Sequence, residues 1–488
     1  MSAAPADRLA PAGQRPLPLP AVLAAAHFPD PHSPGMSGLA SYLARRGARV
    51  TVAPSQAQRD SELLSRLSRS GALLQHPDAR TTSLIWGGDG AAVPEMLDLA
   101  TGRGLPTMGH SRAVELLSGT APTTVAVVGS HSTAMAAAAL TCALAVRDPG
   151  WILNDAPYGD APGYDGSGEV LVVDVCPDGA VHEAEPPGWR HRTLGAGLRP
   201  TVTLVTGVDE APPAFLTREE ALEQIEALAR RSETVVVWSG QVGCDELVER
   251  LRRHPGPRVV SVGRGEGMDV AVLGLLWSGE DHRLTIQAGG ERSIVTVPVA
   301  GTTAALGVAA AFAAGWALGL SGTDLADGLT AFPGVERSLT RLGTVGGVTV
   351  LESRAQHPEE IAADLRGARM LTEGAVVVLY EPVGHLRTAA LAGRITEALT
   401  AADHTVLMPV HSASVRSQRH ADGIEALVRA ASGGTLVIPE PGSCQMGPDD
   451  LAVSLAQRGD LILTIGPDAA RRIGPHLLAA LDQPRPAR

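Results

Sequence analysis

The chain has 488 residues, of which 44% are hydrophobic and only 3% aromatic, so it is long enough for about three domains with cores of small and aliphatic side chains. Its formal net charge is −12 without a long basic run, which argues against a nucleic-acid partner. All 40 lysine-or-arginine residues are arginine, which excludes chemistry that needs a lysine amine from this chain's own side chains.

Cysteine usage and the N-terminal segment bear on the compartment of the protein. The four cysteines, Cys142, Cys176, Cys244 and Cys444, lie far apart without a C-x-x-C pair, which indicates a reducing compartment and neither a disulfide framework nor a zinc site. Residues 1–20 are rich in proline and alanine with an early acidic residue, so we expect a flexible tail rather than a signal peptide. These features favour a cytoplasmic protein.

Two blocks of alternating strands and helices follow this tail. Residues 21–121 hold the apolar runs AVLAAAHF, ARVTVAP and TTSLIW between helical patterns such as VPEMLDLATGRG and SRAVELL. Residues 122–333 hold the strand candidates TTVAVVG, EVLVVDV, TVTLVTG, ETVVVW and RVVSV. In this block a helix begins with a capping box from Thr217 to Glu220, and we expect residues 303–320 to form a buried helix rather than a membrane span.

The third block, residues 334–488, repeats the alternation. It contains AVVVLY, HTVLMPV, TLVIP and DLILTI, each followed by a helical pattern. Alternating strands and helices predict parallel sheets with helices on both faces, which is a doubly wound α/β architecture in each block. We therefore expect three α/β domains after the tail.

Six short motifs stand in an order that is typical of one enzyme family. They are HFPDPHSPGMSG at 27–38, RAVELL at 112–117, AFPGVERSLTRLG at 331–343, ESRAQHPEEI at 352–361, EPVGHLRT at 381–388 and DLILTIG at 460–466. The chain thereby resembles the Mur ligase family of peptidoglycan synthesis, in particular its UDP-N-acetylmuramate–L-alanine ligases. The family's own patterns include H-F-x-G-x-G-G-x-G-M-S-G, D-D-Y-G-H-H-P-T-E-I and D-L-V-L-T-M-G.

The resemblance implies a three-domain Mur ligase architecture, one domain for each block. A Rossmann-like N-terminal domain would bind a UDP-sugar with a loop that includes Gly35, Met36 and Ser37. A central P-loop-type, ATPase-like domain would bind ATP with magnesium, and a Rossmann-like C-terminal domain would close over an amino acid. In the family, ATP phosphorylates the muramoyl carboxylate and the incoming amine attacks the acyl phosphate.

The family's phosphate loop, G-T-H-G-K-T-T, corresponds to the stretch after the strand TTVAVVG. Gly129, Ser130 and His131 match its first three positions, and Thr133 falls on the lysine unless three residues have been deleted. In either alignment the phosphates lose their ammonium partner, although backbone amides and the helix dipole still attract an anion. The motif is therefore a vestigial phosphate loop.

The motifs for magnesium and adenine are changed as well. The family's E-A-D-E-S-D-G becomes VDVCPDG, which keeps Asp178 but has Val173 in place of the first glutamate. T-N-I-D-x-D-H becomes TGVDEAP, which keeps Asp209 and loses the asparagine and the histidine. The H-N pair that holds adenine becomes Thr302 and Thr303. Asp178 and Asp209 are thus vestigial catalytic candidates, and we predict no metal site.

The remaining candidates lie in the sugar-nucleotide loop and the C-terminal motifs. Prolines and Asp30 replace most loop glycines, which removes amide donors and adds negative charge. Arg337 and Arg387 persist and are candidates for a remaining anionic ligand or for surface ion pairs. His357 is a vestigial catalytic candidate or the start of a helix, and residues 411–420 form either an anion-binding loop or a solvated one.

Two functions remain open at this point. The joint loss at the lysine, glutamate, histidine, adenine and diphosphate positions favours a pseudoenzyme without ATP or magnesium as cofactors. Its partner would be a cell-wall synthesis protein or a small anionic ligand. The surviving motif residues leave an alternative, an active but rewired ATP-dependent ligase that joins an amino acid to UDP-N-acetylmuramate or a related carboxylate.

Overall fold

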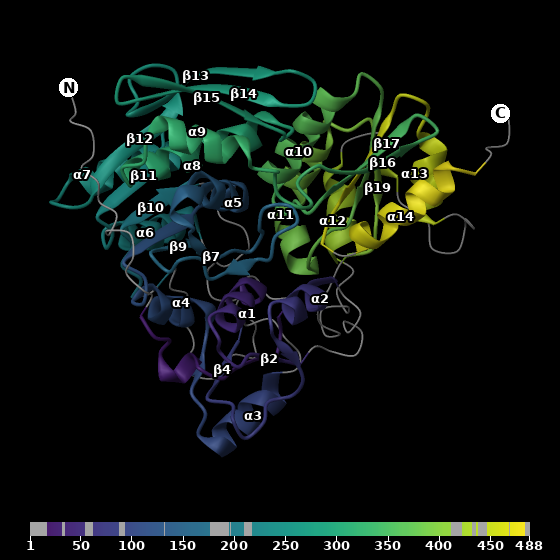
Figure 1. The fold of residues 1–488 in the computed structure, drawn as a ribbon. Coiled ribbons are helices and arrows are strands. Elements are labelled where there is room, and N and C mark those ends of the chain that lie inside the picture. Colours follow the sequence, from purple (N-terminus) through teal and green to yellow (C-terminus); the bar gives the residue numbers. More distant parts are fainter. Residues whose placement is uncertain are drawn as a thin grey trace.

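The fold is an α/β assembly built on three separate sheets. The structure is a computed structural model and describes residues 17–31, 35–53, 62–86, 93–130, 132–175, 195, 197–208, 217–410, 422–431, 436–437, 447–467 and 469–483. Figure 1 shows the central sheet with its helices, an N-terminal lobe below it and a C-terminal lobe beside it. Each sheet falls within one of the three predicted blocks, and the α/β class is confirmed.

The first sheet is small and entirely parallel, with strand order β3-β2-β1-β4-β5. Its elements are β1 (Ala26–Phe28), α1 (Met36–Arg45), β2 (Thr51–Val52), α2 (Glu62–Arg69), β3 (Leu73–Leu74), β4 (Ser83–Ile85), α3 (Val93–Arg103), β5 (Thr107–Met108) and α4 (His110–Ser118), after a 3-10 turn at Ala21–Leu23. The strands have only two or three residues, so most of this lobe's core comes from helices that cover them.

The central sheet has ten strands in the order β15-β14-β13-β12-β11-β10-β6-β9-β7-β8. Its first half contains β6 (Thr123–Val128), α5 (Thr133–Ala143), a 3-10 turn (Ala145–Arg147), β7 (Gly150–Ile152), β8 (Gly163–Tyr164), β9 (Val170–Asp174), β10 (Val202–Val205) and α6 (Arg218–Ala229). Its second half contains β11 (Thr234–Trp238), α7 (Val242–Arg252), β12 (Arg258–Arg264), β13 (Val270–Trp277), β14 (His282–Ala288), β15 (Glu291–Val297), α8 (Thr302–Ala317) and α9 (Gly322–Thr330).

Two predictions about helices of this block are confirmed. At the start of α6 the Thr217 N–H donates to the Glu220 carboxylate over 2.7 Å, and the Glu220 N–H donates to the Thr217 hydroxyl over 3.2 Å. Helix α8 covers most of the apolar run and is buried along nearly its whole length. In the part of the chain that the structure describes, no helix is long and apolar enough to cross a membrane.

The third sheet has six strands in the order β16-β17-β21-β18-β19-β20. Its elements are β16 (Thr340–Val345), β17 (Val348–Ser353), α10 (Pro358–Leu371), β18 (Val376–Tyr380), α11 (His385–Leu399), β19 (His404–Leu407), α12 (Asp422–Ala430), β20 (Leu436–Val437), α13 (Pro448–Leu455), β21 (Leu461–Ile465) and α14 (Ala469–Leu481). Hydrophobic clusters lie on both faces of this sheet, as expected for a doubly wound arrangement.

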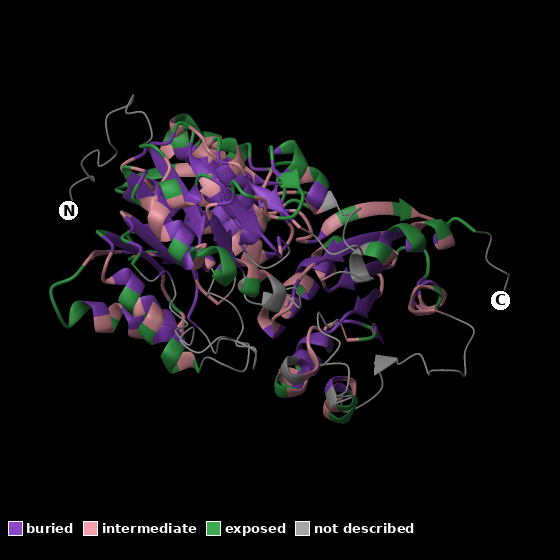
Figure 2. Ribbon diagram, turned by 90° about the horizontal axis from the view of Figure 1, so that it is seen from below, coloured by how far each residue is buried: buried purple, intermediate pink, exposed green. Residues whose placement is uncertain are grey.

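The sheets are rich in parallel pairs as predicted, but three of their edges pair antiparallel, which the prediction did not include. Strands β7–β8, β13–β14–β15 and β16–β17 pair antiparallel. The turn between β14 and β15 consists of Gly289 and Gly290, both with positive φ, which is the geometry that a two-residue hairpin requires. Helices α8 and α9 cover one face of β13–β15, while Leu276 and Ile294 stay exposed. Figure 2 shows the buried residues concentrated within the sheets.

The N-terminal and central lobes share one hydrophobic cluster and approach each other closely through glycines. A Cβ on Gly38 of α1 would lie 2.3 Å from the carbonyl oxygen of Leu153. A Cβ on Gly163 of β8 would lie 2.0 Å from the carbonyl oxygen of Gly38. The motif glycine at position 38 therefore has a structural role, because any side chain there would push the two lobes apart.

Candidate functional site

The candidate phosphate loop lies at the carboxyl edge of the central sheet, between β6 and α5. A Cβ on Gly129 would stand 2.3 Å from the Thr206 hydroxyl oxygen and 2.9 Å from the Gly207 amide nitrogen. The Ser130 N–H donates to the Gly207 carbonyl over 3.1 Å. This loop is therefore packed tightly against the segment that follows β10, and one of its amides already has an intramolecular acceptor.

The backbone of this loop favours a substitution over a deletion at the lysine position. Ser132 has φ 58°, a left-handed conformation that favours glycine, and Thr133 is the first residue of α5. In an ungapped alignment with G-T-H-G-K-T-T, Ser132 falls on the second glycine and Thr133 on the lysine. The left-handed turn thus stands at the position of the second glycine in this alignment, and threonine stands at the position of the lysine; His131 lies outside the described residues.

The strand beside the phosphate loop carries a buried carboxyl group. Asp174 is the last residue of β9 and pairs in register with Val127 of β6. Asp174 is 3% exposed. The Asn154 side-chain amide donates to Asp174 Oδ2 over 2.7 Å. Burial raises the pKa of Asp174 to about 6, against the opposing effect of the bonds from the Asn154 side chain and main chain. Val173, at the family's glutamate position, is fully buried in the hydrophobic cluster on the opposite face.

The predicted acidic candidates of this region lie outside the described residues. Asp178 and Asp209 are not described, and neither is the loop at 411–420. Among the residues that the structure does describe, no group of three or more His, Cys, Asp or Glu side chains gathers as a metal site. Thr302 and Thr303 begin α8 after Gly301, so the adenine positions of the family fall on the first turn of a helix.

Arg337 lies in the segment between the central and C-terminal sheets, and it is held by ionic and polar bonds. Its Nε donates to Glu352 Oε1 over 2.5 Å, and its Nη2 donates to the Gly466 carbonyl over 2.5 Å. The Arg337 side chain is 18% exposed and that of Glu352 is 8% exposed. Of the two roles left open for Arg337, the structure favours the ion pair.

A second arginine of the C-terminal motifs reaches the central lobe. Arg354 Nη1 forms an ion pair with Asp155, which follows the loop residue Asn154 directly. Beside it, the Ser353 hydroxyl donates to the Asp364 carboxylate, and burial raises the pKa of Asp364 to about 7. Arg354 stands where the family motif D-D-Y-G-H-H-P has tyrosine, so an aromatic position has become a cation paired across the lobes.

The other C-terminal candidates lie at helix starts. His357 precedes Pro358, the first residue of α10, and its N–H donates to Glu360 Oε2 over 3.3 Å. The prediction that His357 and Pro358 begin a helix is confirmed. Arg387 lies in the first turn of α11, and its side chain is outside the described part of the structure.

The substrate-loop candidates surround the start of α1. Gly35 has φ 77° and precedes Met36, which is fully buried, and Ser37, which is half-buried. A Cβ on Gly35 would stand 2.6 Å from His110 Nε2. His110 is 3% exposed, neither ring nitrogen meets a hydrogen-bond partner among the described residues, and burial lowers its pKa to about 4. Sequence reasoning missed His110, because nothing along the chain links it to a loop 75 residues earlier.

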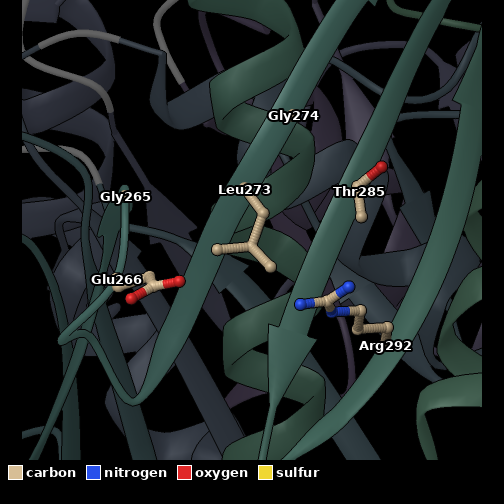
Figure 3. A pocket seen from close by; sticks show the side chains of 6 residues that line it. All are labelled: Gly265, Glu266, Leu273, Gly274, Thr285 and Arg292. Atoms are coloured by element: carbon tan, nitrogen blue, oxygen red, sulfur yellow. The ribbon is translucent and has the colours of Figure 1, made fainter.

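A hollow of ≈ 390 Å³ lies away from these residues, on the outer side of the antiparallel strands. Its lining is Gly265, Glu266, Leu273, Gly274, Thr285 and Arg292. In Figure 3, Glu266 and Arg292 flank Leu273 from opposite sides of the hollow. It is open to solvent and belongs to strands β13 to β15 and the turn before them, not to the phosphate loop.

Comparisons with known proteins agree with the fold described above. The chain matches no family model. It is 30% identical over 484 residues to a UDP-N-acetylmuramate–L-alanine ligase of Streptomyces avermitilis, covering 95% of this chain and 99% of that protein. A second such ligase, from Streptomyces coelicolor, is 29% identical with the same coverage.

Solved structures give the same answer for the fold. A UDP-N-acetylmuramate–alanine ligase from Thermotoga maritima aligns with TM-score 0.68 at 17% identity, over 93% of this chain and 98% of that one. A murein peptide ligase from Psychrobacter arcticus also aligns with TM-score 0.68, at 16% identity, over 95% and 100% of the two chains.

Proposed function

This chain belongs to the Mur ligase family, among the relatives of UDP-N-acetylmuramate–L-alanine ligases, and within that family we propose that it has lost ATP-dependent ligase activity. We propose that it retains a binding or regulatory role linked to cell-wall synthesis in the cytoplasm. Its partner would be a cell-wall synthesis protein or a small anionic ligand.

One observation carries this proposal. The candidate phosphate loop has a left-handed turn at Ser132, and Thr133 aligns with the lysine position in a chain without any lysine. A loop that cradles phosphates needs free amide donors and a cation for the transferred charge. Here the Ser130 amide is bonded to Gly207 and the cation is absent, so the loop does not fit the phosphates of ATP.

The contacts of two charged motif residues, Asp174 and Arg337, support the same proposal. A magnesium ligand must present an ionised carboxylate to the metal. Asp174 is instead buried, and its Oδ2 already accepts a bond from the Asn154 side-chain amide over 2.7 Å. Arg337 is bonded to Glu352 and to the Gly466 carbonyl. The described residues therefore satisfy one another and do not fit magnesium and nucleotide in the family's manner.

A second candidate function rests on the full-length similarity. The relatives are named as ligases, and the chain matches them over nearly their whole length. An active enzyme with rewired residues, joining an amino acid to UDP-N-acetylmuramate or a related carboxylate, is the alternative. It would need a cation from elsewhere in the chain to replace the lysine.

Calorimetric titration with Mg-ATP and with UDP-N-acetylmuramate tests the proposal. We expect no saturable binding of either ligand in the micromolar range by the natural chain. The double variant Ser132→Gly, Thr133→Lys restores the glycine and the lysine and should gain Mg-ATP affinity, whereas the matched variant Ser132→Gly, Thr133→Ala should not. Micromolar binding of both ligands by the natural chain would overturn the proposal.

A further inference from the structure

A short loop after β7 connects three parts of the molecule. Within residues 154–158, Asn154 donates to Asp174 beside the phosphate loop, and Asp155 pairs with Arg354 of the C-terminal lobe. The Tyr158 N–H donates to the Gly334 carbonyl over 2.9 Å. Pro157 also forms an isolated antiparallel bridge with Val335. One loop of the central lobe thus contacts both the C-terminal lobe and the segment that leads into it.

That leading segment, residues 334–339, has an unfavourable backbone. Arg337 has φ 57° and Leu339 has φ 55°, and both are residues whose side chains disfavour the left-handed region. Such a conformation persists only where the surroundings hold it. Here the Arg337 N–H donates to the Thr340 hydroxyl over 2.8 Å, and the Arg354 N–H donates to the Arg337 carbonyl over 2.9 Å.

The same segment is also tied to the N-terminal lobe. Arg66 of α2 pairs with Glu336 over 2.6 Å, and the two side chains are 20% and 30% exposed. Figure 1 shows α2 at the edge of the N-terminal lobe that faces the C-terminal lobe. The N-terminal lobe thus pairs with Glu336 within the strained segment. The central lobe pairs with Arg354, which is hydrogen-bonded to that segment through the Arg337 carbonyl.

We propose that the loop 154–158 and the segment 334–339 form a clasp that holds the three lobes together without a bound ligand. The pairs Arg354–Asp155 and Arg66–Glu336 close this clasp. The two left-handed residues between them would relax to an ordinary conformation when the pairs open. Whether the clasp is closed or open then depends on these intramolecular ion pairs. The proposal does not depend on whether the chain has ligase activity.

Hydrogen exchange of single amides tests the clasp in the full chain. The double variant Arg66→Ala, Asp155→Ala removes one partner of each pair and leaves the reporter residues Tyr158 and Arg354 unchanged. The amides of Tyr158 and Arg354 should then exchange about tenfold faster, since two partly exposed pairs together supply about that factor. The Val175 amide, which donates to Val127 within the central sheet, should stay slow and so report an intact central lobe.

The matched control is Arg218→Ala, which breaks the pair with Glu246 inside the central lobe. That pair has the same 2.6 Å length, and both of its side chains are 32% exposed. The control should leave the Tyr158 and Arg354 amides unchanged. A second measurement needs no substitution: about 1 M sodium chloride screens exposed charges and should speed the same two amides in the natural chain. Unchanged exchange in both the double variant and high salt would overturn the clasp.

Discussion

Replacing the buried carboxyl group beside the phosphate loop should stabilise the protein. Burial raises the pKa of Asp174 from 3.8 to about 6, because the charged form loses its hydration. A difference of about two pKa units corresponds to about 3 kcal/mol. Asp174→Asn keeps the shape of the side chain, and its amide oxygen can still accept the bond from the Asn154 side chain, so the variant removes the cost of the charge and keeps that bond.

The sign of the pH dependence follows from the raised pKa. Below about pH 4 the carboxyl group is protonated in both the folded and the unfolded chain, and it contributes nothing to pH dependence. Between about pH 4 and 6 the unfolded chain ionises first, so the free energy of unfolding falls, and the loss is complete above about pH 6. The variant should therefore gain at most about 3 kcal/mol near neutral pH and nothing near pH 4.

The assay is exchange of the slowest amides of β6 and β9, followed across this pH range after correction for intrinsic rates. Asp403→Asn is a control of opposite sign. Burial alone would raise the pKa of Asp403, but bonds from the Val376 N–H and from Arg369 outweigh burial and lower it. Losing that carboxylate should destabilise the protein near neutral pH. If Asp174→Asn destabilises the central lobe, or keeps the full pH dependence, the assignment of a buried carboxyl group with a raised pKa is refuted.

Three further substitutions probe the loop and the C-terminal arginine. Ser132→Gly should raise the free energy of unfolding by about 1 kcal/mol, because glycine accepts φ 58° without steric cost; unchanged or lower stability in chemical denaturation would count against the left-handed turn. Gly129→Ala should lower it by about 2 kcal/mol, because the new methyl group meets the Thr206 hydroxyl, and a neutral effect would show that the loop is looser than described. Arg337→Ala should lower the free energy of unfolding by about 3 kcal/mol, because it leaves Glu352 buried without its partner. The thermal unfolding transition of the C-terminal lobe measures this loss. A decrease in the transition temperature no larger than that of Arg218→Ala would contradict the ion pair.

The phosphate loop was predictable because its signal is local. A β-branched run, a glycine and a helical pattern follow one another within a few residues, and the structure places β6, the loop and α5 there. The left-handed conformation of Ser132 was not predictable, because serine carries no preference for it. That conformation favours a substitution over a deletion, the two alternatives that the sequence left open.

The ion pairs between the lobes could not be predicted from the sequence. Asp155 and Arg354 are almost two hundred residues apart, and Arg66 and Glu336 are further apart still. Ion pairs between lobes depend on how the lobes dock, and no periodicity along the chain records this. One signal did exist: Asn154 is the only asparagine of the chain, and it lies at the carboxyl edge of the central sheet.

The antiparallel edges were missed for a different reason. The prediction of a parallel sheet came from strands that alternate with helices, and the segment with β13, β14 and β15 has no helix between its strands. The Gly289-Gly290 turn between two apolar-polar alternations is the sequence signal of this hairpin.

The central claim, loss of ligase activity, is tested most directly by a turnover assay. The purified chain would be incubated with Mg-ATP, UDP-N-acetylmuramate and L-alanine, then with other amino acids and carboxylates, beside the Streptomyces avermitilis ligase as the positive control. We predict neither phosphate release nor an amide product in any mixture with this chain, while the control turns over. Phosphate release that requires both the carboxylate and the amine, together with the amide product, would contradict the account.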